Sequence, residues 1–102
     1  MFRDKLTQIK PDDIDGNIEI LTSLTDKLVI FLEGMQISDG QIHDRYLKQQ
    51  AESIIMAQAT VDSVRLFLKD RDPVCASFAL GFAVACITQS GISMEEIEQI
   101  LE

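Results

Sequence analysis

The sequence lacks tryptophan altogether, contains one tyrosine and one histidine, and places no lysine or arginine after Arg71. Its 102 residues carry nine basic and 17 acidic side chains, which gives a formal net charge of -8. Nucleic-acid binding depends on cationic side chains that displace counterions from phosphate groups. The shortage of basic residues therefore predicts that the chain does not bind DNA or RNA directly.

Charged side chains of either sign are absent from residues 73–94. The most apolar part of this stretch, residues 74–87, would span about 21 Å as a helix, against about 30 Å for the hydrocarbon core of a bilayer. It also contains alanine, glycine and serine, and no tryptophan or tyrosine marks a membrane interface. We therefore predict a core helix and no membrane insertion.

Cysteine is scarce, because the chain contains only Cys75 and Cys86. On one helix these residues would lie roughly 16 Å apart, which is too far for a disulfide bond. Neither has a second thiol or a histidine at the spacing of metal ligands, so the sequence predicts no zinc site. Free cysteines suit a reducing compartment, and the N-terminus has no apolar signal-peptide core, so we expect a cytoplasmic protein.

Helix start and stop signals are frequent in the sequence. Ser38 and Ser93 each begin a capping box that is flanked by two isoleucines in the positions of a hydrophobic staple. The predicted helices cover residues 12–33, 41–72, 73–90 and 94–101, with residues 1–10 as a short helix or a loose arm. This pattern predicts a single all-α domain over residues 1–102, a compact helical bundle in which helix 73–90 is central.

The predicted helix over residues 41–72 is unusually long. It would measure about 45 Å, whereas a compact domain of this size has a diameter of about 35 Å. A second apolar strip, formed by Ile55, Ala59 and Leu66, lies about a third of a turn from its core-facing side. We therefore expect either a break in the helix or a homodimer or higher assembly that uses this strip as its interface.

An acidic strip lies opposite the core face of the predicted first helix. Its members are Asp15, Glu19, Asp26 and Glu33, with Ile30 as the only large apolar residue beside them. Lys27 is the only basic residue of this segment and lies off the strip, so the sequence predicts a nearly unneutralised face. Such a face is usually only solvated, but it also suits docking onto a basic protein surface.

Residues 13–18 resemble part of an EF-hand loop, with acidic residues before a glycine and an isoleucine after it. Aligning the glycine places Pro11 and Thr22 at the first and last ligand positions, where calcium requires carboxylates. Two ligands are therefore missing, and we interpret the acidic residues as a helix start that the helix dipole favours. The sequence predicts neither a metal nor a cofactor.

Two residues carry side chains with catalytic potential, His43 and Cys75. His43 falls within the core-facing arc of helix 41–72, and no nucleophile stands at a defined spacing from it. Cys75 lies in the first turn of the next helix, where the helix dipole lowers a thiol pKa while the neighbouring Asp72 opposes that effect. An enzyme that uses Cys75 or His43 is therefore our third hypothesis, and we predict that the chain is not an enzyme.

Small residues recur along helix 73–90, where Ser77, Gly81 and Ala85 are spaced four apart. Residues at this spacing share one helix face and leave it without side-chain bulk. The pattern predicts that another helix packs closely against this face.

The leading functional hypothesis is a non-enzymatic protein–protein interaction module. It describes a small acidic regulator, adaptor or inhibitor that docks a helical face onto a protein partner with a basic surface. The alternative is an acidic mimic of nucleic acid that inhibits a DNA- or RNA-binding protein. The leading hypothesis depends on surplus apolar surface on helix 41–72, an acidic face on helix 12–33 and the absence of any assembled catalytic motif.

Overall fold

The computed structural model describes residues 2–34 and 45–102, with side chains from residue 50 onward in the second range. These residues form helices and no strands. The helices are α1 (Phe2–Thr7), α2 (Ile14–Gly34), α3 (Arg45–Lys69), α4 (Pro73–Gln89) and α5 (Met94–Leu101). The predicted all-α bundle is therefore confirmed. Of the two alternatives for residues 1–10, a short helix or a loose arm, residues 2–7 form the short helix. The predicted capping box at Ser38 lies outside the described residues.

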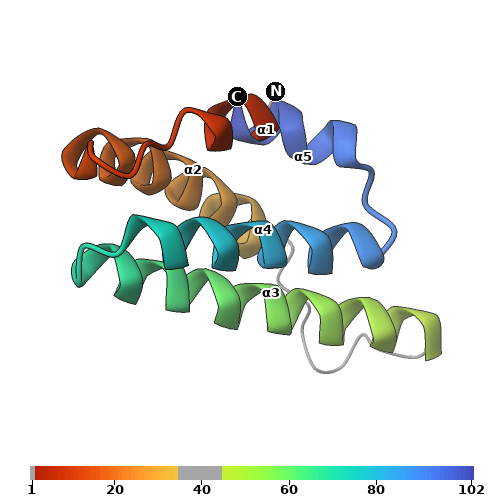
Figure 1. The fold of residues 1–102 in the computed structure, drawn as a ribbon. Coiled ribbons are helices and arrows are strands. Elements are labelled where there is room, and N and C mark those ends of the chain that lie inside the picture. Colours follow the sequence, from red (N-terminus) through yellow and green to blue (C-terminus); the bar gives the residue numbers. More distant parts are fainter. Residues whose placement is uncertain (1, 35–44) are drawn as a thin grey trace.

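The helices form an elongated bundle (Figure 1). Helices α3 and α4 lie side by side and antiparallel, and α2 packs against both of them. Helices α1 and α5 lie together on the side of α4 that faces away from α3, so both chain ends come close to each other (Figure 1). The bundle extends over 49 × 26 × 17 Å, so the 25-residue α3 fits without a break. The length of this helix is therefore no argument for a dimer.

The core confirms the helical periodicity of the sequence. Leucines of α2 at the expected spacing are fully buried where α2 packs against α3, α4 and α5. The most deeply buried apolar residues are Leu21, Leu24, Leu28 and Leu32 of α2, Ala57, Val61 and Val64 of α3, Leu80, Ala83 and Ile87 of α4, and Ile97 and Leu101 of α5. Phe2 of α1 joins this cluster. Ile14 lies at the first position of α2, where its side chain is exposed.

The turn between α3 and α4 is short because each helix end carries its own capping device. Arg71 adopts a left-handed conformation with φ 61°, the Asp72 N–H donates to the Phe67 carbonyl at 2.8 Å, and the Arg71 N–H donates to the Leu68 carbonyl at 3.1 Å. This pair of hydrogen bonds is a Schellman motif. Asp72 then accepts a hydrogen bond from the Cys75 N–H at 3.2 Å and caps α4, which begins at Pro73 as predicted.

Helix α5 is fixed at both of its ends. The Ser93 side chain accepts from the Glu96 N–H at 3.2 Å, which confirms the helix start predicted there. At the other end, Lys5 Nζ of α1 donates to the Leu101 carbonyl at 3.0 Å, and Lys27 Nζ of α2 lies 3.5 Å from the same oxygen. Cations favour the C-terminal end of a helix because of its negative partial charge. Two lysines thus join α5 to α1 and α2.

The loop before α2 is held by a buried amide. The Asn17 side chain accepts from the Lys10 N–H at 2.9 Å and donates to the Lys10 carbonyl. Asn17 is almost fully buried, so both halves of its amide are satisfied by the main chain of one loop residue. This contact sets the position of α1 relative to α2.

Candidate protein-interaction surface

Large apolar side chains remain uncovered on one side of the bundle. Six of them are more than half exposed and belong to α3 or α4, and Phe78 is the most exposed at 78%. We call this set the hairpin surface: Ile55, Met56 and Leu66 of α3, with Val74, Phe78 and Phe82 of α4. Outside this set, Ile14 and Ile30 of α2 are the other large apolar side chains that are exposed in the described part of the chain.

The exposed side of α4 follows from its packing. Ala76, Leu80 and Ala83 point toward α2 and α3 and are fully buried. Val74, Phe78 and Phe82 are spaced four residues apart, so they share another face of the same helix. Helix α4 does occupy the middle of the bundle (Figure 1), but the expectation that the rest of the chain encloses it is wrong.

On α3, the strip predicted from the sequence is uncovered within the monomer. Ile55 and Leu66 are each 63% exposed, and Ala59 is exposed between them. Met56 adds a further exposed side chain on the same helix. The use of Ile55, Ala59 and Leu66 as an oligomer interface stays a prediction.

The two halves of the hairpin surface lie on neighbouring antiparallel helices. Gln50 Nε2 donates to the Ser90 carbonyl at 2.6 Å, which fixes the register of the two antiparallel helices. Equal steps from this pair toward the turn place Asp62 at the level of Phe78 and Gln58 at the level of Phe82, so Ser63 and Ala59 each lie one residue nearer the turn. Small side chains of α3 thus lie within one residue of the level of the two exposed phenylalanines on the neighbouring helix.

Gly81 and Ala85 of α4 do not pack against another helix. A side chain at Gly81 would meet no atom within 4 Å and Ala85 is exposed, so the close packing predicted for Ser77, Gly81 and Ala85 is wrong at Gly81 and Ala85. Gly81 and Ala85 instead line an open groove of about 720 Å³. Its other apolar walls include Phe2 and Leu6 of α1 and Met94 of α5. The groove adjoins the face of α4 that carries Phe78 and Phe82.

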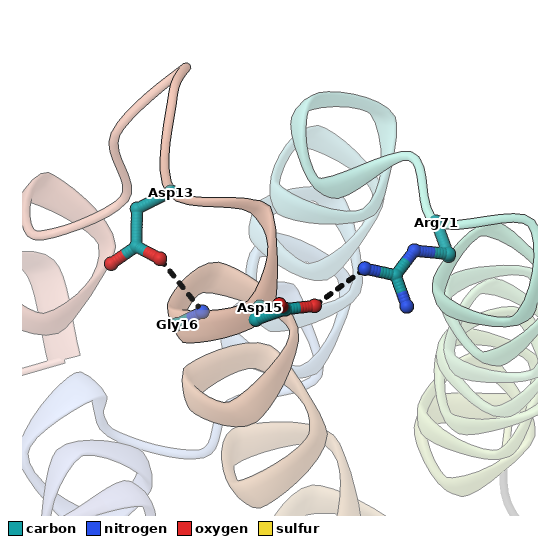
Figure 2. Close-up of polar contacts among 4 residues, drawn as sticks. All are labelled: Asp13, Asp15, Gly16 and Arg71. Carbon is teal, nitrogen blue, oxygen red and sulfur yellow. Dashed lines mark hydrogen bonds and ion pairs between the residues drawn. The ribbon is translucent and has the colours of Figure 1, made fainter.

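The acidic strip of α2 is exposed, as the sequence predicts, and Ile30 beside it is 70% exposed. Figure 2 shows Arg71 of the hairpin turn reaching Asp15, with 2.5 Å between guanidinium and carboxylate. Arg65 of α3 lies 3.4 Å from Asp26. The expectation of a nearly unneutralised face is therefore wrong for Asp15 and Asp26. Sequence reasoning missed these arginines because they lie far away in the chain.

Glu19 and Glu33 are the remaining members of the acidic strip, and both are exposed. They lie on the outer face of α2, whereas the buried leucines of that helix point toward the hairpin. The acidic strip therefore lies outside the hairpin surface, although Asp15 and Asp26 reach arginines of the hairpin turn and of α3.

The residues that resemble an EF-hand loop have other roles. Asp13 Oδ1 accepts from the Gly16 N–H at 3.1 Å and caps α2 (Figure 2). Asp15 is paired with Arg71. Across residues 2–34 and 45–102, no group of three or more His, Cys, Asp or Glu side chains is placed to hold a metal ion.

Cys75 is exposed at the start of α4, beside Asp72. The hydrogen bond to Asp72 and its negative charge raise the pKa of the Cys75 thiol above its usual value, and desolvation adds to this shift. The same contact lowers the pKa of Asp72. A catalytic cysteine requires the opposite shift, because the thiolate is the nucleophile. His43 lies outside the described residues.

Comparison of the chain with family models, with curated proteins and with solved structures gives no match. Within the described residues, none of the helices has the length and hydropathy that a membrane span requires. The functional proposal therefore depends on the fold and on the hairpin surface alone.

Proposed function

We propose that this chain is a non-enzymatic protein-interaction module that docks the hairpin surface onto another protein molecule. The observation that carries this proposal is the group of six large apolar side chains, each more than half exposed, on two adjacent helices. Soluble monomers rarely leave contiguous apolar patches of more than a few hundred Å² uncovered, and larger patches mark interaction sites. The core does not require these residues, since α2, α3, α4 and α5 bury a separate set of apolar side chains.

The acidic strip supports a second contact within the same proposal. Glu19, Glu33 and Ile30 are exposed on α2, outside the hairpin surface, and suit a partner with a basic surface. Such charges mainly set the association rate and the specificity of a complex. Lysine at positions 19 and 33 should therefore slow association with a basic partner without changing the helical content.

The alternative of a nucleic-acid mimic has weaker support. A mimic of a phosphate row requires a dense series of free carboxylates, whereas Arg71 and Arg65 lie among those of the acidic strip. The raised pKa of the Cys75 thiol likewise speaks against an enzyme that uses this residue as a nucleophile. We place the protein in a reducing compartment such as the cytoplasm, because an exposed free thiol is stable there.

A site-specific photo-crosslinker tests whether the hairpin surface binds protein. Benzoylphenylalanine replaces Phe78 in one variant and Gln99, an exposed residue of α5, in a control variant. Irradiation in cells of the native source should give a protein adduct from position 78 and none from position 99. Absence of any protein adduct at position 78 would contradict the proposed function.

A further inference from the structure

We infer that the molecule that covers the hairpin surface is a second copy of this chain, held in a two-fold symmetric dimer with α4 at its centre. This inference rests on the proposed function, because it names the partner of the same surface. The proposed interface differs from the one predicted from the sequence, because it includes α4 as well as Ile55, Ala59 and Leu66 of α3.

The charge distribution favours a second copy. A two-fold symmetric interface places the same patch of both molecules in contact, so the net charge of the patch is present on both sides of the interface. The resulting repulsion matters here because the formal net charge of one chain is -8. Over residues 73–89, α4 carries no charged side chain, whereas α2 and α5 expose several carboxylates. Electrostatic repulsion between two copies is therefore weaker for a contact centred on α4 than for one centred on α2 or α5.

The size of the apolar area also fits a dimer. A standard interface buries about 800 Å² on each partner. With about 150–250 Å² for each aromatic side chain, the exposed parts of Phe78 and Phe82 supply roughly 250 Å². The four other members of the hairpin surface and the exposed Ala59 and Ala85 bring the total to the order of 800 Å².

The shape of α4 allows the two copies to approach closely. Phe78 and Phe82 protrude, while Gly81 and Ala85 between and beside them present little bulk. A side chain at Gly81 would meet open space, so the monomer leaves a recess at this position. In an antiparallel pairing of α4 with its copy, the phenylalanines of one molecule pack beside Gly81 of the other, as knobs pack into holes between helices.

The test compares Phe78→Asp with Ile30→Asp by sedimentation equilibrium over a range of concentrations. Both substitutions add one negative charge at an exposed apolar residue, at 78% and 70% exposure, so they form a matched pair. The wild type and Ile30→Asp should sediment at twice 11.4 kDa. Phe78→Asp should raise the dissociation constant about 30-fold or more, as expected for a residue at the centre of an interface. Phe78→Gln, which adds no charge, should weaken the dimer in the same direction.

Circular dichroism and thermal melting of the diluted variants show whether each monomer is folded. If Phe78→Asp is unfolded, the comparison is made with Phe78→Gln. A wild-type monomer at several hundred micromolar would overturn the dimer, and so would equal dissociation of the Phe78 and Ile30 variants. If position 78 then crosslinks to a different protein, the proposed function stands and only the second copy is excluded. If it crosslinks to nothing, both proposals fail.

Discussion

Arg71 and Asp15 form an ion pair of 2.5 Å although they stand 56 positions apart, and Arg71 reaches it from a left-handed backbone conformation. The pair joins the hairpin turn to the start of α2 (Figure 2). A left-handed conformation costs a non-glycine residue about 1–2 kcal/mol, and an exposed ion pair contributes about 0–1 kcal/mol. Backbone strain at Arg71 therefore equals or exceeds the gain from its side chain.

Arg71→Gly and Arg71→Ala separate these two contributions. Both variants lose the ion pair, but only glycine removes the strain, so Arg71→Gly should be about 1 kcal/mol more stable than Arg71→Ala. Urea unfolding of both variants and the wild type measures this difference. Asp15→Ala serves as the control, because it removes the ion pair and leaves the backbone of residue 71 unchanged. A more stable alanine variant would contradict the left-handed turn.

Thr25 provides a substitution that should stabilise the protein. Its hydroxyl is buried without a hydrogen-bond partner, in a residue that is 1% exposed. Thr25→Val keeps the shape of the side chain and removes the unsatisfied oxygen, so the free energy of unfolding should rise by about 1–3 kcal/mol. Thr22→Val, at an exposed position of the same helix, should change it by less than about 0.5 kcal/mol. A loss of stability in Thr25→Val would show that the hydroxyl has a partner in solution.

Asp72 and Cys75 give a prediction about pH. Because the pKa of Asp72 is lowered from 3.8, its capping contribution is present above pH 3.8 and is lost as the pH falls through the folded pKa. Asp72→Asn keeps a capping side chain without charge, so the stability difference between this variant and the wild type should change only in strongly acidic solution. Urea unfolding of both proteins at several pH values measures this stability difference. A change of the same size near neutral pH would contradict the lowered pKa of Asp72.

The same pair controls the reactivity of a thiol. Asp72 raises the pKa of the Cys75 thiol, so iodoacetamide should alkylate Cys75 slowly at neutral pH. Asp72→Asn removes the negative charge and should speed this reaction. Buried Cys86 provides the internal control, because its alkylation rate should not change. Equal rates at Cys75 in both proteins would show that Asp72 does not act on the thiol.

Gly81 tests the corrected packing of α4. Since a side chain there meets open space, Gly81→Ala should stabilise the monomer by up to about 1 kcal/mol through helix propensity. The substitution is made in the Phe78→Asp background, in which the proposed dimer should not form and should not contribute to the measured stability. Unfolding by urea measures the effect. Clear destabilisation would restore the close packing that the spacing of Ser77, Gly81 and Ala85 predicts.

Local signals explain why much of the fold was predictable from the sequence. Asp72-Pro73 and Ser93 mark helix starts because their side chains and backbone act on residues within one turn. The buried leucines of α2 follow from the helical period, and so does the uncovered strip of α3.

Other features depend on contacts that the sequence pattern does not contain. Helix α4 is apolar on all sides, so its periodicity does not tell which face the other helices cover, and the exposure of Phe78 and Phe82 was missed. The partners of Asp15 and Asp26 come from a different helix and from the hairpin turn. The open space at Gly81 depends on where α1 lies, which the weak pattern of residues 1–10 does not determine.

The central claim is that protein covers the hairpin surface in solution, and solvent accessibility of its methyl groups tests this most directly. Paramagnetic relaxation by a soluble, uncharged gadolinium complex reports the exposure of each methyl group by NMR. As the protein concentration rises, the methyl groups of Ile55, Leu66 and Val74 should become shielded, while Ile30 on α2 should stay accessible. If all four remain equally accessible at the highest concentration, or if only Ile30 becomes shielded, the hairpin surface is not the contact surface.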